Sequence, residues 1–112
     1  MKKIKNQGAQ GDVLFRRIEK IPNDATKQPR TRNGIIVAHS ETGHHHVILD
    51  AGVEHFRDTS NELLSYLQVD TSGDVVHLRP FDTHETMRLG AGAWEVRIQR
   101  EHAPEGWRRV ED

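Results

Sequence analysis

The chain has 112 residues, a formal net charge of −1, a pI of about 6.7 and no cysteine. The near-neutral charge and the scattered arginines argue against a nucleic-acid-binding protein, because such proteins carry a clustered basic surface. The lack of thiols excludes cysteine nucleophiles and thiolate metal sites, and it favours a reducing, cytoplasmic location. No apolar run approaches the roughly 20 residues that span a bilayer, and no signal peptide is recognisable, so no membrane association is expected. We expect a single β domain over residues 1–112.

The first third of the chain is predicted to contain one strand between irregular segments. Residues 1–10 are polar and are expected to form a loose N-terminus. Residues 12–21 have the composition of a strand that stops at Pro22-Asn23-Asp24. Residues 22–33 show no periodicity and are predicted to be an exposed loop.

A β-hairpin is predicted around the run Gly43-His44-His45-His46. Residues 34–40 are rich in β-branched side chains, Glu41-Thr42-Gly43 fits a three-residue hairpin loop, and residues 44–50 form the return strand. Residues two apart on a strand share a face, so His44 and His46 should point the same way and His45 the other way. This register gives the opposed pairs Ser40–His44, His39–His45, Ala38–His46 and Val37–Val47.

The second half reads as further short strands separated by turns. Residues 53–57 form a short strand, and residues 61–69 fit either a helix or a strand. Residues 71–74 and 90–92 have the composition of turns, while residues 75–78 and 83–89 are extended. Residues 94–100 are an amphipathic strand that places Trp94, Val96 and Ile98 on one face, so Trp94 is predicted to lie in the core. A terminal segment with Trp107 and Val110 is expected to add an edge strand.

Short strands with turns every 8 to 12 residues or so indicate an all-β fold. We therefore predict a small single-domain barrel or sandwich of short antiparallel strands, cupin-like or related.

Several motifs in a fixed order resemble a small uncharacterised family of bacterial and phage proteins. They are Gly11-Asp12-Val13-Leu14, Thr42-Gly43-His44-His45-His46, His84 ahead of Leu89-Gly90-Ala91-Gly92-Ala93-Trp94, and Gln99-Arg100-Glu101. The resemblance singles out His44, His46 and His84, with His45 at the variable middle position. The chain departs from the family pattern at Gly90, where proline is usual, at Trp94, where tyrosine is usual, and at Phe81, where a further histidine is often found.

His44, His46 and His84 are the predicted metal ligands. Three neutral imidazoles with water in an open fourth position are typical of a catalytic zinc site or a cupin-like metal site. Zinc is the preferred ion, and iron, nickel and manganese are alternatives. Glu85 or Asp82 is a candidate fourth ligand or orienting partner.

The other histidines, His39, His45, His55, His77 and His102, are interpreted as ordinary surface or strand residues. The sequence leaves two classes of function open. The first is a small metal-binding β-barrel protein, with a small-molecule ligand if it is a metalloenzyme. The second is a metal-free binding or assembly module, such as a phage or accessory protein that acts through homo-oligomeric contacts.

Overall fold

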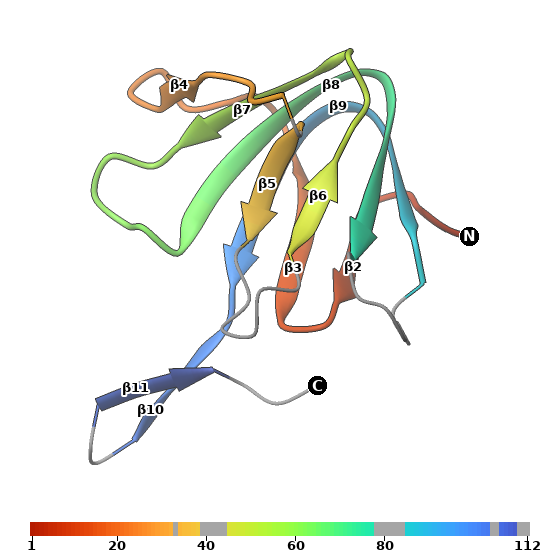
Figure 1. Cartoon of the computed structure of the whole chain (residues 1–112). Helices are drawn as coiled ribbons and strands as arrows, with labels where there is room; N and C mark the ends of the chain where they lie inside the picture. The colour runs from red at the N-terminus through yellow and green to blue at the C-terminus, as the bar shows by residue number, and fades with distance from the viewer. Residues whose placement is uncertain (33, 39–44, 78–84, 104–105, 110–112) are drawn as a thin grey trace.

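The computed structural model is all-β and places nine of its strands in one sheet (Figure 1). It describes residues 1–32, 34–38, 45–77, 85–103 and 106–109, with side chains up to residue 99. The strands are β1 (Lys2–Ile4), β2 (Gln7–Gln10), β3 (Val13–Ile18), β4 (Thr26–Gln28), β5 (Ile35–Ala38), β6 (His46–Ile48), β7 (Val53–Arg57), β8 (Leu64–His77), β9 (Met87–Ile98), β10 (Arg100–Ala103) and β11 (Gly106–Arg109). The prediction of an all-β fold is confirmed. The described residues include no helix long and apolar enough to cross a membrane.

The long antiparallel pair β8–β9 is the spine of the sheet. The first half of β8 pairs with β7, and β7 pairs on its other side with β4. The C-terminal half of β9 pairs with β3, and β3 pairs on its other side with β2. The second half of β8 pairs with β6, which carries β5. The N-terminal half of β9 pairs in parallel with β1, whereas the other pairs are antiparallel. Each half of the spine therefore carries its own set of flanking strands.

The spine bends where the two strands change register. Val69 lies opposite Gly92, but Ser72 lies opposite Gly90, so β8 has one more residue than β9 across this irregularity. Gly92 has φ of 129°, which L side chains rarely adopt. Because of this register shift, the buried apolar side chains of both halves of the β8–β9 pair lie on the same face of the sheet, which is its inner face. The predicted turns at 71–74 and 90–92 are thus wrong: these segments face each other within two continuous strands.

Arg17 on β3 and Trp94 on β9 donate hydrogen bonds to backbone carbonyls at the bend. The Arg17 guanidinium donates to the Ala91 carbonyl and lies 4.7 Å from the centre of the Trp94 ring. Arg17 Nε also donates to the Lys5 carbonyl at 2.9 Å, and Trp94 Nε1 donates to the Gly90 carbonyl at 2.9 Å. The Arg17 side chain occupies the space beside Gly90 and Gly92, where a β-carbon would meet its nitrogens.

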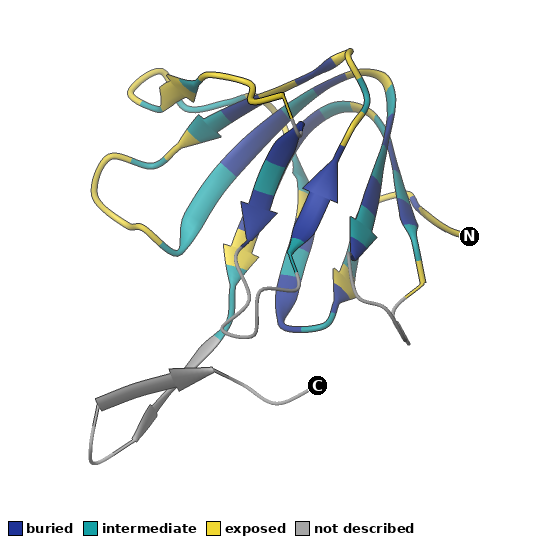
Figure 2. Cartoon of the chain, viewed as in Figure 1, coloured by how far each residue is buried: buried dark blue, intermediate teal, exposed yellow. Residues whose placement is uncertain are grey.

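The two halves of the bent sheet pack together around one hydrophobic core. Trp94, Phe15 and Val96 from one half and Met87, Leu89 and Val75 from the other belong to the same buried cluster. Strands β5 and β6 are likewise largely buried, as their dark blue colour in Figure 2 shows. Trp94 is fully buried, which confirms its predicted place in the core. Ile98 packs against the cluster, so the predicted apolar face of residues 94–98 is also confirmed.

The sheet is not a closed barrel, and that alternative of the fold prediction is wrong. Strands β2 and β5 end the path of hydrogen-bonded neighbours without pairing with each other. The terminal strand also differs from the prediction, because β11 pairs with β10 in a separate two-stranded sheet and adds no edge to the main one.

The expected loose N-terminus at residues 1–10 is wrong as well. β1 lies against β9, and β2 lies against β3, with Ile4 and Gln10 buried. Polar composition misled the prediction, because the backbone of these residues supplies sheet hydrogen bonds whatever their side chains. Of the predicted exposed loop at residues 22–33, residues 22–32 are described; they are largely exposed but contain β4, which pairs with β7.

The hairpin of β5 and β6 has the predicted partners at one end. Ala38 lies opposite His46, as predicted. A one-residue bulge between Ile36 and Ala38 places Val47 opposite Ile36, so the predicted Val37–Val47 pair is wrong. The pairs Ser40–His44 and His39–His45 lie outside the described residues.

Candidate metal centre

His46 and His77 form a buried cross-strand pair at one end of the sheet. They lie opposite each other on β6 and β8 and are 4% and 7% exposed. Their rings are stacked, with centroids 4.4 Å apart and planes inclined by 19°. Ile48 and Val75 form the next inward-facing pair on the same two strands, so the imidazoles border the hydrophobic core.

Gln10 holds the His46 ring in a defined orientation. It is 2% exposed at the end of β2, and its Nε2 donates to the carbonyls of Val75 at 2.9 Å and Glu85 at 3.0 Å. Because both amide hydrogens have carbonyl acceptors, the amide cannot be flipped without loss of two hydrogen bonds. Gln10 Oε1 therefore faces His46 Nδ1, at 2.7 Å.

This contact determines which ring nitrogen of a neutral His46 has the proton. An amide oxygen only accepts hydrogen bonds, so Nδ1 must donate. Nε2 is then the nitrogen with the lone pair, which is the atom that binds a metal or accepts a hydrogen bond. Metal-binding histidines commonly donate their other N–H to a protein oxygen in this way.

The structure covers one of the three predicted metal ligands. His46 is described, whereas His44 and His84 lie outside the described residues. In the chain, His44 precedes His46 by two residues, and His84 directly precedes Glu85, whose carbonyl binds Gln10. Among the described residues, no three His, Cys, Asp or Glu side chains gather closely enough to hold a metal.

The structure describes one of the two candidate carboxylates, Glu85. The Glu85 side chain is 58% exposed and forms an ion pair with the amino group of Met1 at 2.9 Å, so the structure places it with a different partner. Asp82 lies outside the described residues.

Gln10 and His77 are the members of this cluster that the sequence reasoning missed. His77 was interpreted as an ordinary strand residue, but β6 places its ring against His46. No local pattern reveals this pair, because it depends on pairing between strands that are about 30 residues apart. Gln10 had a weak signal: it is a polar residue directly before the Gly11-Asp12 turn.

His55 is a third buried histidine, on β7, nine residues after His46 in the chain. Its side chain is 8% exposed, and Nε2 has no hydrogen-bond partner among the described residues. Burial, with a smaller contribution from the positive charge of Arg57, lowers the pKa of His55 from 6.5 to about 4. The neutral ring is the form that this position accommodates.

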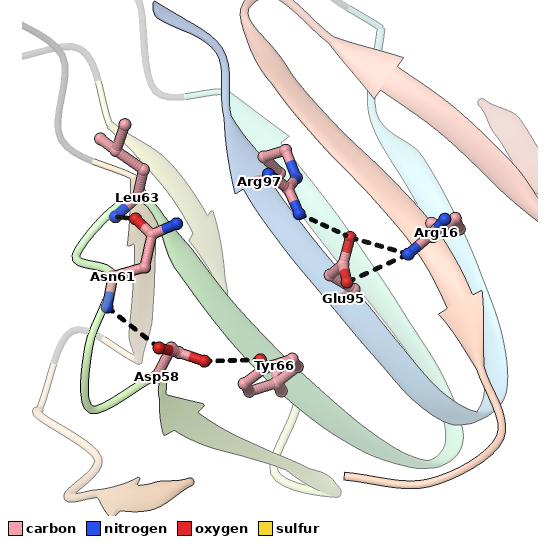
Figure 3. Close-up of polar contacts among 7 residues, drawn as sticks. All are labelled: Arg16, Asp58, Asn61, Leu63, Tyr66, Glu95 and Arg97. Carbon is pink, nitrogen blue, oxygen red and sulfur yellow. Dashed lines mark hydrogen bonds and ion pairs between the residues drawn. The ribbon is translucent and has the colours of Figure 1, made fainter. Parts of the chain in front are cut away.

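The polar contacts of Asp58 have a structural explanation. Asp58 Oδ1 accepts hydrogen bonds from the Ser60 and Asn61 amides at 2.9 Å, and Oδ2 accepts one from the Tyr66 hydroxyl at 2.9 Å. Figure 3 shows the contacts with Asn61 and Tyr66. The Ser60 amide, followed by the Tyr66 hydroxyl, lowers the pKa of Asp58, and burial followed by the bond to Asp58 raises the pKa of Tyr66 to about 12. These contacts fix the turn between β7 and β8.

The comparisons with known proteins identify a family and no activity. No curated protein and no solved structure matches the chain. One family profile matches residues 9–99, which include β3, the β8–β9 spine and the whole Gln10–His46–His77 cluster. The match agrees with the predicted resemblance to an uncharacterised family. The chain therefore belongs to the family described as Domain of unknown function (DUF8820).

Proposed function

We propose that this protein binds a transition metal through His46, with His44 and His84 as the other protein ligands. The observation that carries the proposal is the Gln10 side chain. Its Oε1 accepts a hydrogen bond from His46 Nδ1–H at 2.7 Å, and its Nε2 donates one to the carbonyl of Glu85 at 3.0 Å. Gln10 thereby joins the strand that follows His44 to the segment that follows His84.

The chemistry of the His46 environment fits a metal ligand. Gln10 keeps a proton on Nδ1, so Nε2 of the neutral ring has the lone pair that a metal ligand needs. The ring is fixed by stacking on His77, so coordination would cost little side-chain entropy. An imidazole set favours zinc, with iron, nickel and manganese as alternatives. Bound zinc would supply Lewis acidity, or a water with a pKa of about 7.

Elemental analysis of protein purified without an affinity tag tests the proposal. We expect close to one equivalent of metal per chain, and less than about a tenth of an equivalent in His46→Ala and His84→Ala. His102→Ala is the matched control, because its histidine lies on β10, outside the nine-stranded sheet. Wild-type protein that holds less than about a tenth of an equivalent, even after incubation with zinc, would contradict the proposal.

The same preparations test the alternative function. Sedimentation of metal-free protein as a stable homo-oligomer, with no metal uptake, would favour an assembly module. For a metal-loaded protein, a melting temperature that falls sharply on chelation would indicate a structural metal.

A further inference from the structure

The outer face of β2, β3 and β9 carries two rows of side chains on the side opposite to the core. The strand registers align Gln7, Arg16 and Glu95 in one row and Ala9, Leu14 and Arg97 in the next. Residues that lie opposite each other on neighbouring strands share a face. The intervening residues Val13, Phe15 and Val96 belong to the core, so both rows project away from it.

Glu95 brings two arginines together on this face. Arg16 Nη2 lies 3.2 Å from both carboxylate oxygens of Glu95, and Arg97 Nη2 lies 3.7 Å from Oε1 (Figure 3). The Glu95 side chain is 14% exposed, whereas those of Arg16 and Arg97 are 60% and 50% exposed. One carboxylate thus holds two accessible guanidinium groups, and the trio keeps one net positive charge.

The arginines border a hollow of about 520 Å³ on the same strands. Besides the charged trio and Gln7, its lining includes the outward-facing side chains of Ala9 and Leu14. Small-molecule sites have volumes of roughly 300–1,000 Å³ and combine an apolar lining with a few polar groups. The hollow has this combination, with two guanidinium groups beside an apolar floor.

We infer that this hollow binds a small organic anion, a carboxylate with a short apolar body. The carboxylate would accept hydrogen bonds from the Arg16 and Arg97 guanidinium groups, whose planar donor forks suit carboxylates. Among the described residues, Arg16 contacts Glu95 through Nη2 alone, so its Nε and Nη1 can donate to a bound carboxylate. The apolar body would lie over Leu14 and Ala9. This site is on the opposite face of β2 from Gln10 and is independent of the proposed metal centre.

Hexanoate is a suitable probe, and 1-hexanol is its uncharged counterpart. In a titration followed by amide chemical shifts in two-dimensional NMR, we expect hexanoate to give saturable shifts at residues 7–9, 14–16 and 95–97. Hexanol should bind at least about tenfold more weakly, because charge-assisted hydrogen bonds contribute that much or more.

Three variants test which groups carry the affinity. Arg16→Gln and Arg97→Gln should each weaken hexanoate binding about tenfold, whereas Arg32→Gln, an exposed arginine outside the hollow, should leave it unchanged. The substituted side chains are exposed, and the spectrum of each free variant verifies its fold. The inference is overturned if hexanoate shows no saturable shifts, if the shifts map elsewhere, if hexanol binds equally well, or if either hollow variant binds like wild type.

Discussion

Gln10 is a single buried side chain that connects three parts of the fold. Its three hydrogen bonds reach β8, the segment before β9 and the His46 ring on β6. The bonds to Val75 and His46 are buried and the bond to Glu85 is partly buried, so water does not easily replace the first two. The structural role of Gln10 can therefore be tested separately from any metal.

Replacement of Gln10 by leucine should destabilise the protein by about 2–4 kcal/mol, because it leaves two carbonyls and the His46 Nδ1–H unpaired. Gln7→Leu is the matched control on the same strand: Gln7 is exposed, and its loss should change the free energy of unfolding by less than about 0.5 kcal/mol. Urea denaturation of metal-free protein measures both values. Equal effects of the two substitutions would disprove the role given to Gln10.

His55 predicts a pH dependence of stability with a defined sign. Its folded pKa, about 4, is below the unfolded value of 6.5, so the unfolded state binds the proton more tightly. The contribution of His55 to the free energy of unfolding is complete above about pH 6.5. It is lost as the pH falls through 4, and the total loss is about 3 kcal/mol.

Urea unfolding of wild type and His55→Leu between about pH 7 and pH 4 isolates this contribution. We expect the stability of wild type to fall more steeply than that of the variant, since the other titrating groups are common to both. Parallel curves would show that His55 is not held neutral by burial.

At the scale of the elements, the bend in the β8–β9 spine depends on Gly92. Its φ of 129° disfavours a side chain, and a β-carbon at this position would lie only 2.5 Å from Arg17 Nη1. At Gly90 the corresponding contact, to Arg17 Nη2, is 3.0 Å, and φ is not in the left-handed region. The two glycines thus differ in backbone strain although they share a neighbour.

Gly92→Ala should destabilise the protein by about 1–3 kcal/mol, because alanine is strained at this φ and displaces Arg17 from the bend. Gly90→Ala should lower the free energy of unfolding less, since the flexible end of the Arg17 side chain can move by a few tenths of an ångström. Thermal unfolding followed by circular dichroism compares the two. A larger loss in Gly90→Ala than in Gly92→Ala would contradict this account of the bend.

The strands with regular alternation were predictable from sequence, and the bend was not. The Trp94, Val96 and Ile98 face follows a two-residue period, and the structure confirms it. The short strand predicted at residues 53–57 is also confirmed. The glycine-rich segments at 71–74 and 90–92 look like chain reversals, because a bulged bend in a strand needs the same small residues as a turn. Only the pairing of Ser72 with Gly90 shows that these segments form a bend within strands and not turns, and this pairing joins residues that are far apart in sequence.

The candidate site was also predictable only in its local part, the hairpin that contains His46. Alternation around the hairpin places Ala38 opposite His46, and this register is confirmed. The contacts of His46 with His77 and Gln10 arise from β8 and β2, and the sequence contains no signal of which strands meet there. His44 and His84 remain predictions.

At the scale of the whole molecule, one bent sheet separates two chemically different surfaces. Its inner side carries the hydrophobic core and, at one end, the imidazoles and amide of the proposed metal centre. Its outer side carries the Arg16–Glu95–Arg97 trio. Because the strands alternate between these sides, a substitution on one side leaves the other side chains in place. Metal and organic anion should therefore bind independently.

The measurement that tests the metal proposal most directly is nitrogen-15 NMR of the histidine side chains during a zinc titration. We predict that His46 is protonated at Nδ1 in the metal-free protein, and that about one equivalent of zinc shifts its Nε2 resonance while Nδ1 keeps its proton. A His46 ring protonated at Nε2, or one whose nitrogen resonances do not respond to zinc, would contradict the proposal.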